Sequence, residues 1–258
     1  VMVRLIDGVT QEQIAALDAQ AGVVQEVYRS TLVRGLRGVR VAAGTADAAI
    51  ATLKASPLVR YAEHDRIRTA LAQSTPYGIN LVNAPLEWPS SRGSGAIVAD
   101  LDTGIDLGHP DLPVPALTET FISGQTVQDG HGHGTHTAGT IAALDNTAGV
   151  VGVAPSATLI IGKVLADDGN GDDAGVAAGI DWAVANGARV ISMSLGGPDD
   201  TQALHDSCDA ALAAGVEVVD AEGHDNSSVP SYPATYSSGL PVAAVDSTMA
   251  KASFSNFG

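Results

Sequence analysis

Residues 95–104 read GAIVADLDTG, an apolar run that ends at Asp102 and continues into a glycine turn. A short apolar segment between glycines is typical of a strand that is buried on both faces of a parallel sheet. The chemistry of such a sheet collects in the loops that follow its strands. Asp102 is therefore a candidate site residue as well as a marker of the fold.

The same pattern recurs through the rest of the chain after residue 94. Further strands are predicted at 158–165, 189–197 and 216–223, and helices at 172–187 and 201–215. Strands that alternate with helices in this way indicate an α/β fold, with a parallel sheet covered by helices on both faces. The functional loops should then follow Asp102, Ser194 and Glu222.

The first 71 residues follow a different order: strand, helix, strand, strand, helix, strand. Thr10 and Gln13 form a capping-box pattern at the start of the first helix, and this helix ends at Gly22. Residues 45–57 predict a second capped helix. This order of elements predicts a small α+β unit of the ferredoxin-like type.

Charge separates the same two regions. Residues 1–71 hold nine Lys and Arg against seven Asp and Glu, whereas residues 72–258 hold four against twenty-two. The step predicts a domain boundary and suggests that the basic segment docks on the acidic one. An acidic surface that keeps a secreted protein soluble explains the charge equally well. Either way, the acidic excess argues against nucleic acid as a partner.

Two other classes of protein are disfavoured. The sequence has no run of eighteen apolar residues, and its opening VMVRLIDGVTQEQ lacks the features of a signal peptide, so we expect no membrane span and no retained leader. Cys208, the single cysteine, excludes an internal disulfide. Its alanine-rich surroundings favour a buried packing thiol over a nucleophile.

A histidine-rich stretch, DGHGHGTHTAGTIAA at 129–143, follows Asp102 by about thirty residues. Taken singly, a strand-end aspartate usually caps a turn and a histidine between glycines usually packs in a loop. Together they resemble the subtilisin family of serine proteases, in which D-[ST]-G supplies the aspartate of the triad and H-G-T-H supplies its base. The segments ISMSLGGP, YPATY, VAAVDS and ASFSNFG extend this resemblance in the right order over nearly the whole chain.

The resemblance implies a parallel-sheet, three-layer α/β sandwich and assigns roles to two residues. His133 is the base that accepts a hydroxyl proton, and Asp102 fixes its tautomer and stabilises its charged form. His131 lies one step outside the motif, and His136 is expected to pack against the helix rather than to act in catalysis.

The resemblance also implies a peptide-binding cleft and a processing junction. The expected cleft residues are Ser194, Leu195, Gly196, Gly197 and Gly223. Residues 1–71 resemble the inhibitory propeptide of such proteases and residues 72–258 the peptidase domain, with cleavage between Leu71 and Ala72. We expect the propeptide to dock on the peptidase domain of a secreted monomer that acts on peptides or proteins.

A tight Ca²⁺ site is implied as well. An all-oxygen set of ligands suits this ion. The expected ligands are the side chains of Gln73, Asp111 and Asn146 and the backbone carbonyls of Leu144, Ala148 and Val150. Gly149 permits the tight loop that such a site needs.

Two departures from the family pattern concern the chemistry itself. The nucleophile motif G-T-S-M-A-x-P is absent from residues 1–258, and the partial echo at Ser247 lies where a hairpin turn is expected. His224 occupies the oxyanion position, where subtilisins carry a donating asparagine. Asp220 adds an acid to the preceding strand, and a buried carboxylate is costly unless it is paired or protonated.

Three readings follow from these departures. In the first, the chain is a truncated or fragmentary precursor of a subtilisin-like endopeptidase, and its serine lies in a missing C-terminal segment. In the second, it is a noncatalytic protein that binds peptides or acts as a decoy. In the third, Asp102, His133 and His224 bind a transition metal and support a different hydrolysis.

Overall fold

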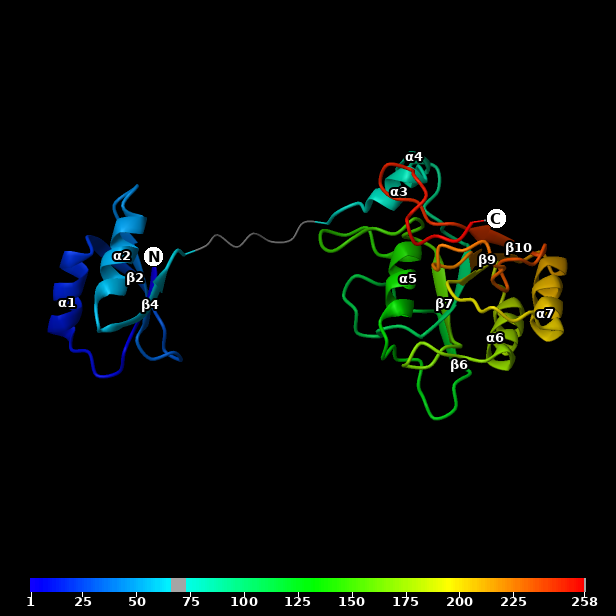
Figure 1. Cartoon of the computed structure of the whole chain (residues 1–258), viewed down its shortest axis with the longest axis horizontal. Coiled ribbons are helices and arrows are strands. Elements are labelled where there is room, and N and C mark those ends of the chain that lie inside the picture. Colours follow the sequence, from blue (N-terminus) through cyan, green and yellow to red (C-terminus); the bar gives the residue numbers. More distant parts are fainter. Residues whose placement is uncertain (66–72, 258) are drawn as a thin grey trace. The chain divides into compact units, whose positions relative to one another are not determined.

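The computed structural model describes residues 1–65 and 73–257. The chain divides into two compact units, Val1–Ala70 and Leu71–Gly258. Figure 1 traces the elements of both units along the sequence. Each unit has its own hydrophobic core, so each is described by itself.

The first unit is a four-stranded antiparallel sheet with two helices. Its elements are β1 (Met2–Leu5), α1 (Gln11–Gln20), β2 (Val23–Arg29), β3 (Leu36–Val41), α2 (Ala46–Ala55) and β4 (Val59–Glu63). The strand order is β2-β3-β1-β4, as expected for the ferredoxin-like type. Ile14 and Leu17 of α1 and Ile50 and Leu53 of α2 share one core cluster with the sheet.

The two helices of this unit begin differently. The capping box of α1 is confirmed: Gln13 N donates to Thr10 Oγ1, and Thr10 N donates to Gln13 Oε1. The predicted cap of α2 is wrong, because Thr45 makes no side-chain cap bond to the helix. Its hydroxyl donates instead to Ala42 O at 2.8 Å, which closes the preceding turn. Sequence pattern alone does not distinguish these two uses of a threonine hydroxyl.

The second unit contains a six-stranded parallel sheet. Its strands are β5 (Ile97–Asp102), β6 (Leu117–Thr120), β7 (Thr158–Lys163), β8 (Val190–Met193), β9 (Glu217–Ala221) and β10 (Gly239–Val242). The strand order is β10-β9-β8-β5-β7-β6, and every neighbouring pair is parallel. From β5 the chain crosses to the edge strand β6, returns to β7 beside β5, and then crosses to β8, from which it continues outward through β9 to β10. The strand β5 thus separates the strands reached first from those reached later, and its carboxyl end lies at the point where the strand order reverses. Ligands of open α/β sheets bind at this point.

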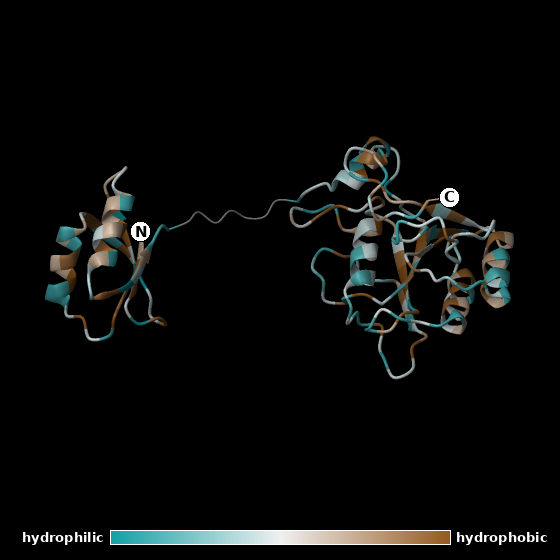
Figure 2. Cartoon of the chain, in the orientation of Figure 1, coloured by the Kyte–Doolittle hydropathy of each residue, from teal (hydrophilic) through white to brown (hydrophobic). Residues whose placement is uncertain are grey.

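Helices cover both faces of this sheet and complete the three-layer sandwich (Figure 1). The helix α5 (His133–Ala142) lies on one face, and α6 (Asp173–Ala185) and α7 (Gln202–Ala213) lie on the other. Cys208 of α7 is buried in the core cluster on the second face, as expected for a packing thiol. In Figure 2 apolar residues, in brown, are frequent in the strands, whereas α7 carries both apolar and polar residues, the latter in teal.

Several short elements have no counterpart in the sequence predictions. They are the edge strands β6 and β10 and the helices α3 (Tyr77–Leu81) and α4 (Ala84–Glu87). The residues of β6 are mostly exposed and carry no apolar alternation, which explains why pattern analysis missed the strand. Within the described residues, no helix is long and apolar enough to cross a bilayer.

The strand β9 buries an acid in the core of the second unit. Asp220 is 1% exposed, and neither of its carboxylate oxygens has a hydrogen-bond partner among the described residues. Burial raises the pKa of Asp220 to about 7. Gly239 of the adjacent β10 makes room for this side chain, because a Cβ there would lie 2.3 Å from Asp220 Oδ2.

We expect Asp220→Asn to remove a pH-dependent loss of stability. In the unfolded chain Asp220 ionises near its ordinary pKa of 3.8, whereas in the folded state its pKa is about 7. Between these values the folded state holds the extra proton, so the free energy of unfolding falls as pH rises and levels off above about pH 7. At mildly alkaline pH the variant should therefore be more stable by roughly 2 to 4 kcal/mol, as measured by urea unfolding.

The control for this experiment is Asp181→Asn, at an exposed position of α6, which should leave the pH dependence unchanged. If the free energy of unfolding varied with pH in the same way in the wild type and in Asp220→Asn, Asp220 would ionise equally in the folded and unfolded states. That result would contradict the prediction.

Candidate active site

Asp102 is the last residue of β5, and its side chain has no exposed surface. Burying a carboxylate is costly unless donors surround it. Asp102 Oδ1 accepts a bond of 2.6 Å from Thr103 N, the first residue after the strand. Its two oxygens also lie 2.7 and 2.8 Å from His133 Nδ1. The predicted pair of Asp102 and His133 is thus brought into direct contact.

His133 is the first residue of α5, and its side chain is 42% exposed. The helix starts from Gly132, whose φ of 99° lies in the left-handed region that glycine adopts readily. The contact with Asp102 uses Nδ1, so the tautomer that donates to the carboxylate carries its proton on that nitrogen. Nε2 is then the ring nitrogen left for proton exchange with a reactant.

A second acid, Asp129, fixes the loop before α5. Its Oδ1 accepts bonds from the backbone N–H groups of His131 and Gly132, and its Oδ2 accepts from both N–H and hydroxyl of Thr135. Thr103 Oγ1 also donates to it, at 2.9 Å. Burial alone would raise the pKa of Asp129, but these bonds outweigh it and lower the pKa to about 2. One carboxylate therefore ties the residue after Asp102 to both sides of His133.

Lys163 at the end of β7 holds the same region from the neighbouring strand. Its ammonium group is fully buried and donates to Thr103 O and to Asp167 Oδ1 at 2.8 Å. Asp167 accepts from Gly130 N as well. The turn after Asp102 and the loop before His133 are thus connected through one buried lysine.

A groove runs past the exposed edge of His133. It consists of two adjoining cavities of about 550 and 310 Å³. Both cavities are lined by the predicted cleft residues Ser194, Leu195, Gly196 and Gly197 and by His224. The larger one also contains His131 and His133. The groove therefore brings the predicted base, cleft and oxyanion-position residues to one surface.

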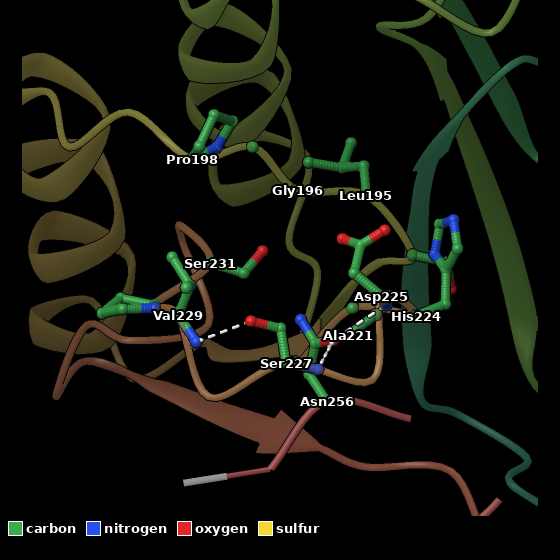
Figure 3. Close-up of a pocket in the computed structure, with 14 residues that line it drawn as sticks. Leu195, Gly196, Pro198, Ala221, His224, Asp225, Ser227, Val229, Ser231 and Asn256 are labelled. Carbon is green, nitrogen blue, oxygen red and sulfur yellow. Dashed lines mark hydrogen bonds between the residues drawn. The ribbon is translucent and has the colours of Figure 1, made fainter. Parts of the chain in front are cut away.

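Figure 3 shows the smaller cavity, which lies between the Leu195–Pro198 stretch and the loop after β9. Asn256 Oδ1 accepts from Asp225 N and Ser227 N, and Asn256 Nδ2 donates to Glu222 O. Gly223, with φ at 105°, leaves space for this amide, because a Cβ there would lie 2.4 Å from Asn256 Nδ2. Asn256 thus shapes the loop that carries His224.

The third hypothesis, a transition-metal site formed by Asp102, His133 and His224, is not supported by the positions of these side chains. Across residues 1–65 and 73–257, no three His, Cys, Asp or Glu side chains are grouped as metal ligands would be. Asp102, His133 and His224 therefore do not form such a group.

The predicted Ca²⁺ ligands do gather at one place. Gln73 Nε2 donates to Leu144 O at 2.5 Å and to Val150 O at 3.1 Å, so this amide sits between two of the expected carbonyls. Asp111 is 7% exposed and accepts from Asn146 Nδ2 at 2.8 Å.

Ala148 joins this cluster through its N–H, which donates to Asn146 Oδ1. Gly149 has a φ of 64°, and a Cβ there would lie 2.1 Å from Asp111 Oδ2. These hydrogen bonds bring the expected residues together, and their side-chain and carbonyl oxygens are of the type that Ca²⁺ binds.

The sequence predictions also concern three residues or segments other than those of the groove and the cluster of expected Ca²⁺ ligands. Leu71 and Ala72, the expected processing junction, lie outside the described residues. Ser247 lies in an exposed turn between Val245 and Lys251, which pair as an antiparallel bridge, as expected for a hairpin turn. His136 is exposed on α5 and was wrongly expected to be packed.

An acid and a histidine in contact at the carboxyl end of the central strand, beside a groove, are an arrangement that can support hydrolysis through a histidine base. The sequence profile of the Subtilase family matches residues 93–258, and the chain belongs to this family. The match thus places the chain in a family of serine-type endopeptidases.

Named relatives agree with this assignment. Subtilisin NAT of Bacillus subtilis subsp. natto and Subtilisin E of Bacillus subtilis (strain 168) are each 46% identical to the chain over 228 residues, which cover 85% of this chain and 60% of each relative. The Alkaline protease of Shouchella clausii is 45% identical over 208 residues, which cover 80% of this chain and 54% of that protein. The chain thus spans little more than half the length of these relatives.

We expect Asp129→Asn to weaken the folded state at neutral pH. The lowered pKa of Asp129, about 2 against an ordinary 3.8, means that its contribution to stability is present above about pH 4 and is lost as pH falls toward 2. Because the side chain is only partly buried, the expected loss is about 1 to 2 kcal/mol. Urea unfolding at neutral and at acidic pH measures it, with exposed Asp181→Asn as the control. A loss of equal size at both pH values would contradict the assignment.

Proposed function

We propose that the chain forms part of a subtilisin-like serine endopeptidase precursor that cleaves peptide bonds through an Asp-His-Ser triad. The observation that carries the proposal is the contact of both Asp102 oxygens, at 2.7 and 2.8 Å, with His133 Nδ1. The family match and the groove beside His133 support it.

In this mechanism His133 is the general base. Nε2 takes the proton of the serine hydroxyl as the oxygen attacks the carbonyl carbon of the substrate, and later gives that proton to the leaving amine. Asp102 keeps the Nδ1 proton in place and stabilises the imidazolium that forms. The serine comes from sequence outside residues 1–258.

The groove lined by Ser194, Leu195, Gly196 and Gly197 takes the substrate as an extended peptide, whose backbone pairs with these residues as an added strand. Gly223 keeps the opposite wall free of a side chain. His224 stands in for the usual asparagine donor, and a ring N–H of the imidazole is the group that can donate to the tetrahedral oxyanion.

The first unit acts as the propeptide of this precursor. Residues 1–71 are weakly basic and residues 72–258 strongly acidic, so long-range attraction favours docking between them. The propeptide assists folding and blocks the groove until the chain is cut between Leu71 and Ala72. Such a precursor is a secreted protein.

Calcium has a structural role in the proposal. Gln73, Asp111 and Asn146 would hold the ion together with the carbonyls of Leu144, Ala148 and Val150. When bound there, the ion would supply positive charge between Asp111 and the oxygen-rich loop of residues 144–150.

The coding sequence beyond the Gly258 codon is the first test of the endopeptidase proposal. We expect an open reading frame that contains the G-T-S-M-A-x-P motif, and a product that hydrolyses a peptide substrate. His133→Ala should lower kcat by about 10⁶-fold, the loss known for the subtilisin triad, because the serine then has no base. Asp102→Asn should lower it by about 10⁴-fold, because the wrong tautomer of His133 is then favoured.

His136→Ala, three residues along the exposed side of the same helix, is the matched control and should keep its kcat. An immediate stop codon would instead favour the noncatalytic reading, in which the groove only binds peptides. In that case a pull-down with peptide libraries should recover a partner at micromolar concentration.

The calcium proposal predicts a stability that depends on the ion. EDTA should lower the Tm by several degrees relative to excess CaCl₂, because an ion that binds only the folded state stabilises it by mass action. Asp111→Asn should abolish most of this difference, since the carboxylate is the only full charge in the ligand set. MgCl₂ serves as the control ion, because Mg²⁺ demands a smaller octahedral site. Equal Tm values in EDTA and CaCl₂ would rule the site out.

A further inference from the structure

Two carboxyl groups lie on one face of β5. Asp100 and Asp102 are two residues apart, so their side chains point to the same side of the strand. Leu101, between them, belongs to the core cluster on the side of α6 and α7. Val98, on the same face as the two acids, packs against the cluster that contains Ala138 of α5. Both carboxyl groups therefore face α5.

The surroundings of the two acids differ. Asp102 faces two N–H groups, from Thr103 and His133. Asp100 is fully buried, and its Oδ2 lies 2.9 Å from Thr137 Oγ1. Its Oδ1 has no hydrogen-bond partner in the part of the chain that the structure describes. Asp100 thus lacks the donors that an ionised carboxylate needs at such a depth.

Among residues 1–65 and 73–257, no unpaired cation beside Asp100 compensates for this lack. The charged groups on the elements around Asp100 are Asp102 on β5, His133 on α5, Asp129 before α5 and Lys163 on β7. His133 is paired with Asp102, and Lys163 with Asp167. Burial first, and the charge of Asp102 second, raise the pKa of Asp100 well above its ordinary value.

The hydrogen bonds of Thr137 also indicate that Asp100 is protonated. Thr137 Oγ1 lies 2.9 Å from Asp100 Oδ2, 2.9 Å from Gly134 O and 3.5 Å from Asp102 Oδ2. A threonine hydroxyl has one hydrogen and can satisfy only one of these oxygens well. If Asp100 carries a proton, it donates to Thr137, and Thr137 donates to Gly134 O. Both short contacts are then hydrogen bonds.

We propose that Asp100 is a positioning residue for the Asp102–His133 pair: a neutral carboxylic acid that ties β5, through Thr137, to the first turn of α5. Gly134, whose carbonyl receives the last bond, directly follows His133. The inference rests on the proposed function, since it concerns how that pair is held and charged. It leaves Asp102 as the only negative charge on this face of β5.

The proposal has a consequence at alkaline pH. Once Asp100 ionises, it takes the hydrogen of Thr137 for itself and releases Gly134 O. It also adds a further negative charge near His133, and a nearby negative charge favours the protonated imidazole. The titration of His133 should therefore be followed by a second, alkaline transition in its ring resonances.

The experiment is an NMR titration of the full 258-residue chain with ¹⁵N-labelled histidine. In the wild type we expect a main His133 transition and a smaller alkaline one. Asp100→Asn should keep the main midpoint and lose the alkaline transition, because the amide is neutral at every pH. Asp102→Asn should shift the main midpoint downward by about one pH unit or more.

The two variants distinguish a failure of the inference about Asp100 from a failure of the proposed function. A midpoint that Asp100→Asn lowers as far as Asp102→Asn does would overturn the inference, because Asp100 would then be ionised in the wild type. A midpoint that Asp102→Asn leaves unchanged would instead count against the Asp102–His133 pair and the proposed function.

An infrared measurement covers the case in which Asp100→Asn does not fold. The difference spectrum between neutral and alkaline pH should show the loss of a protonated-carboxyl C=O band. Asp220 is a second buried acid with a raised pKa, so the spectrum is recorded in an Asp220→Asn background. Absence of the band in that background at neutral pH would overturn the proposal.

Discussion

A fully buried carboxylate, that of Asp102, ends the central strand of the second unit. It is stable there only if hydrogen-bond donors reach it, and the surrounding elements are placed so that they do. Asp102 is stable there as an anion because Thr103 N and His133 Nδ1 both reach it. The first donor requires the chain to turn immediately after β5. The second requires α5 to begin beside that turn, thirty-one residues later in the sequence. The parallel sheet and its crossover meet both requirements.

The helix α5 approaches the turn after β5 too closely for a side chain at Gly134. A Cβ at Gly134 would lie 2.2 Å from Gly104 O, so any side chain there would push the helix away from the turn after Asp102. Asp129 and Lys163 then fix the two loops that meet at this point. Gly134 permits the close approach, and Asp129 and Lys163 fix the orientation. Together they hold His133 against Asp102, while the edge of its ring stays open to the groove.

Much of this arrangement was predictable from local patterns. The apolar strands and the D-T-G and H-G-T-H motifs predicted the sheet, Asp102 and His133, because each of these signals lies within a few consecutive residues. Asn256 was missed because its bonds reach back about thirty residues, to Asp225 and Ser227. The same applies to Asp100, whose partner lies thirty-seven residues away on α5.

The wrong prediction of a cap at Thr45 has a different origin. A threonine before a helix can accept from an N–H of the first turn or donate to a preceding carbonyl, as Thr45 does to Ala42 O, and the sequence is the same in both cases.

The contact between Asp220 and Gly239 restricts the order in which substitutions can accumulate. With Asp220 in place, position 239 has no room for a Cβ, and with a larger residue at 239 an aspartate at 220 has no room for its carboxyl group. A lineage can therefore acquire the acid only after the neighbouring strand has lost its side chain, and can regain that side chain only after the acid has gone.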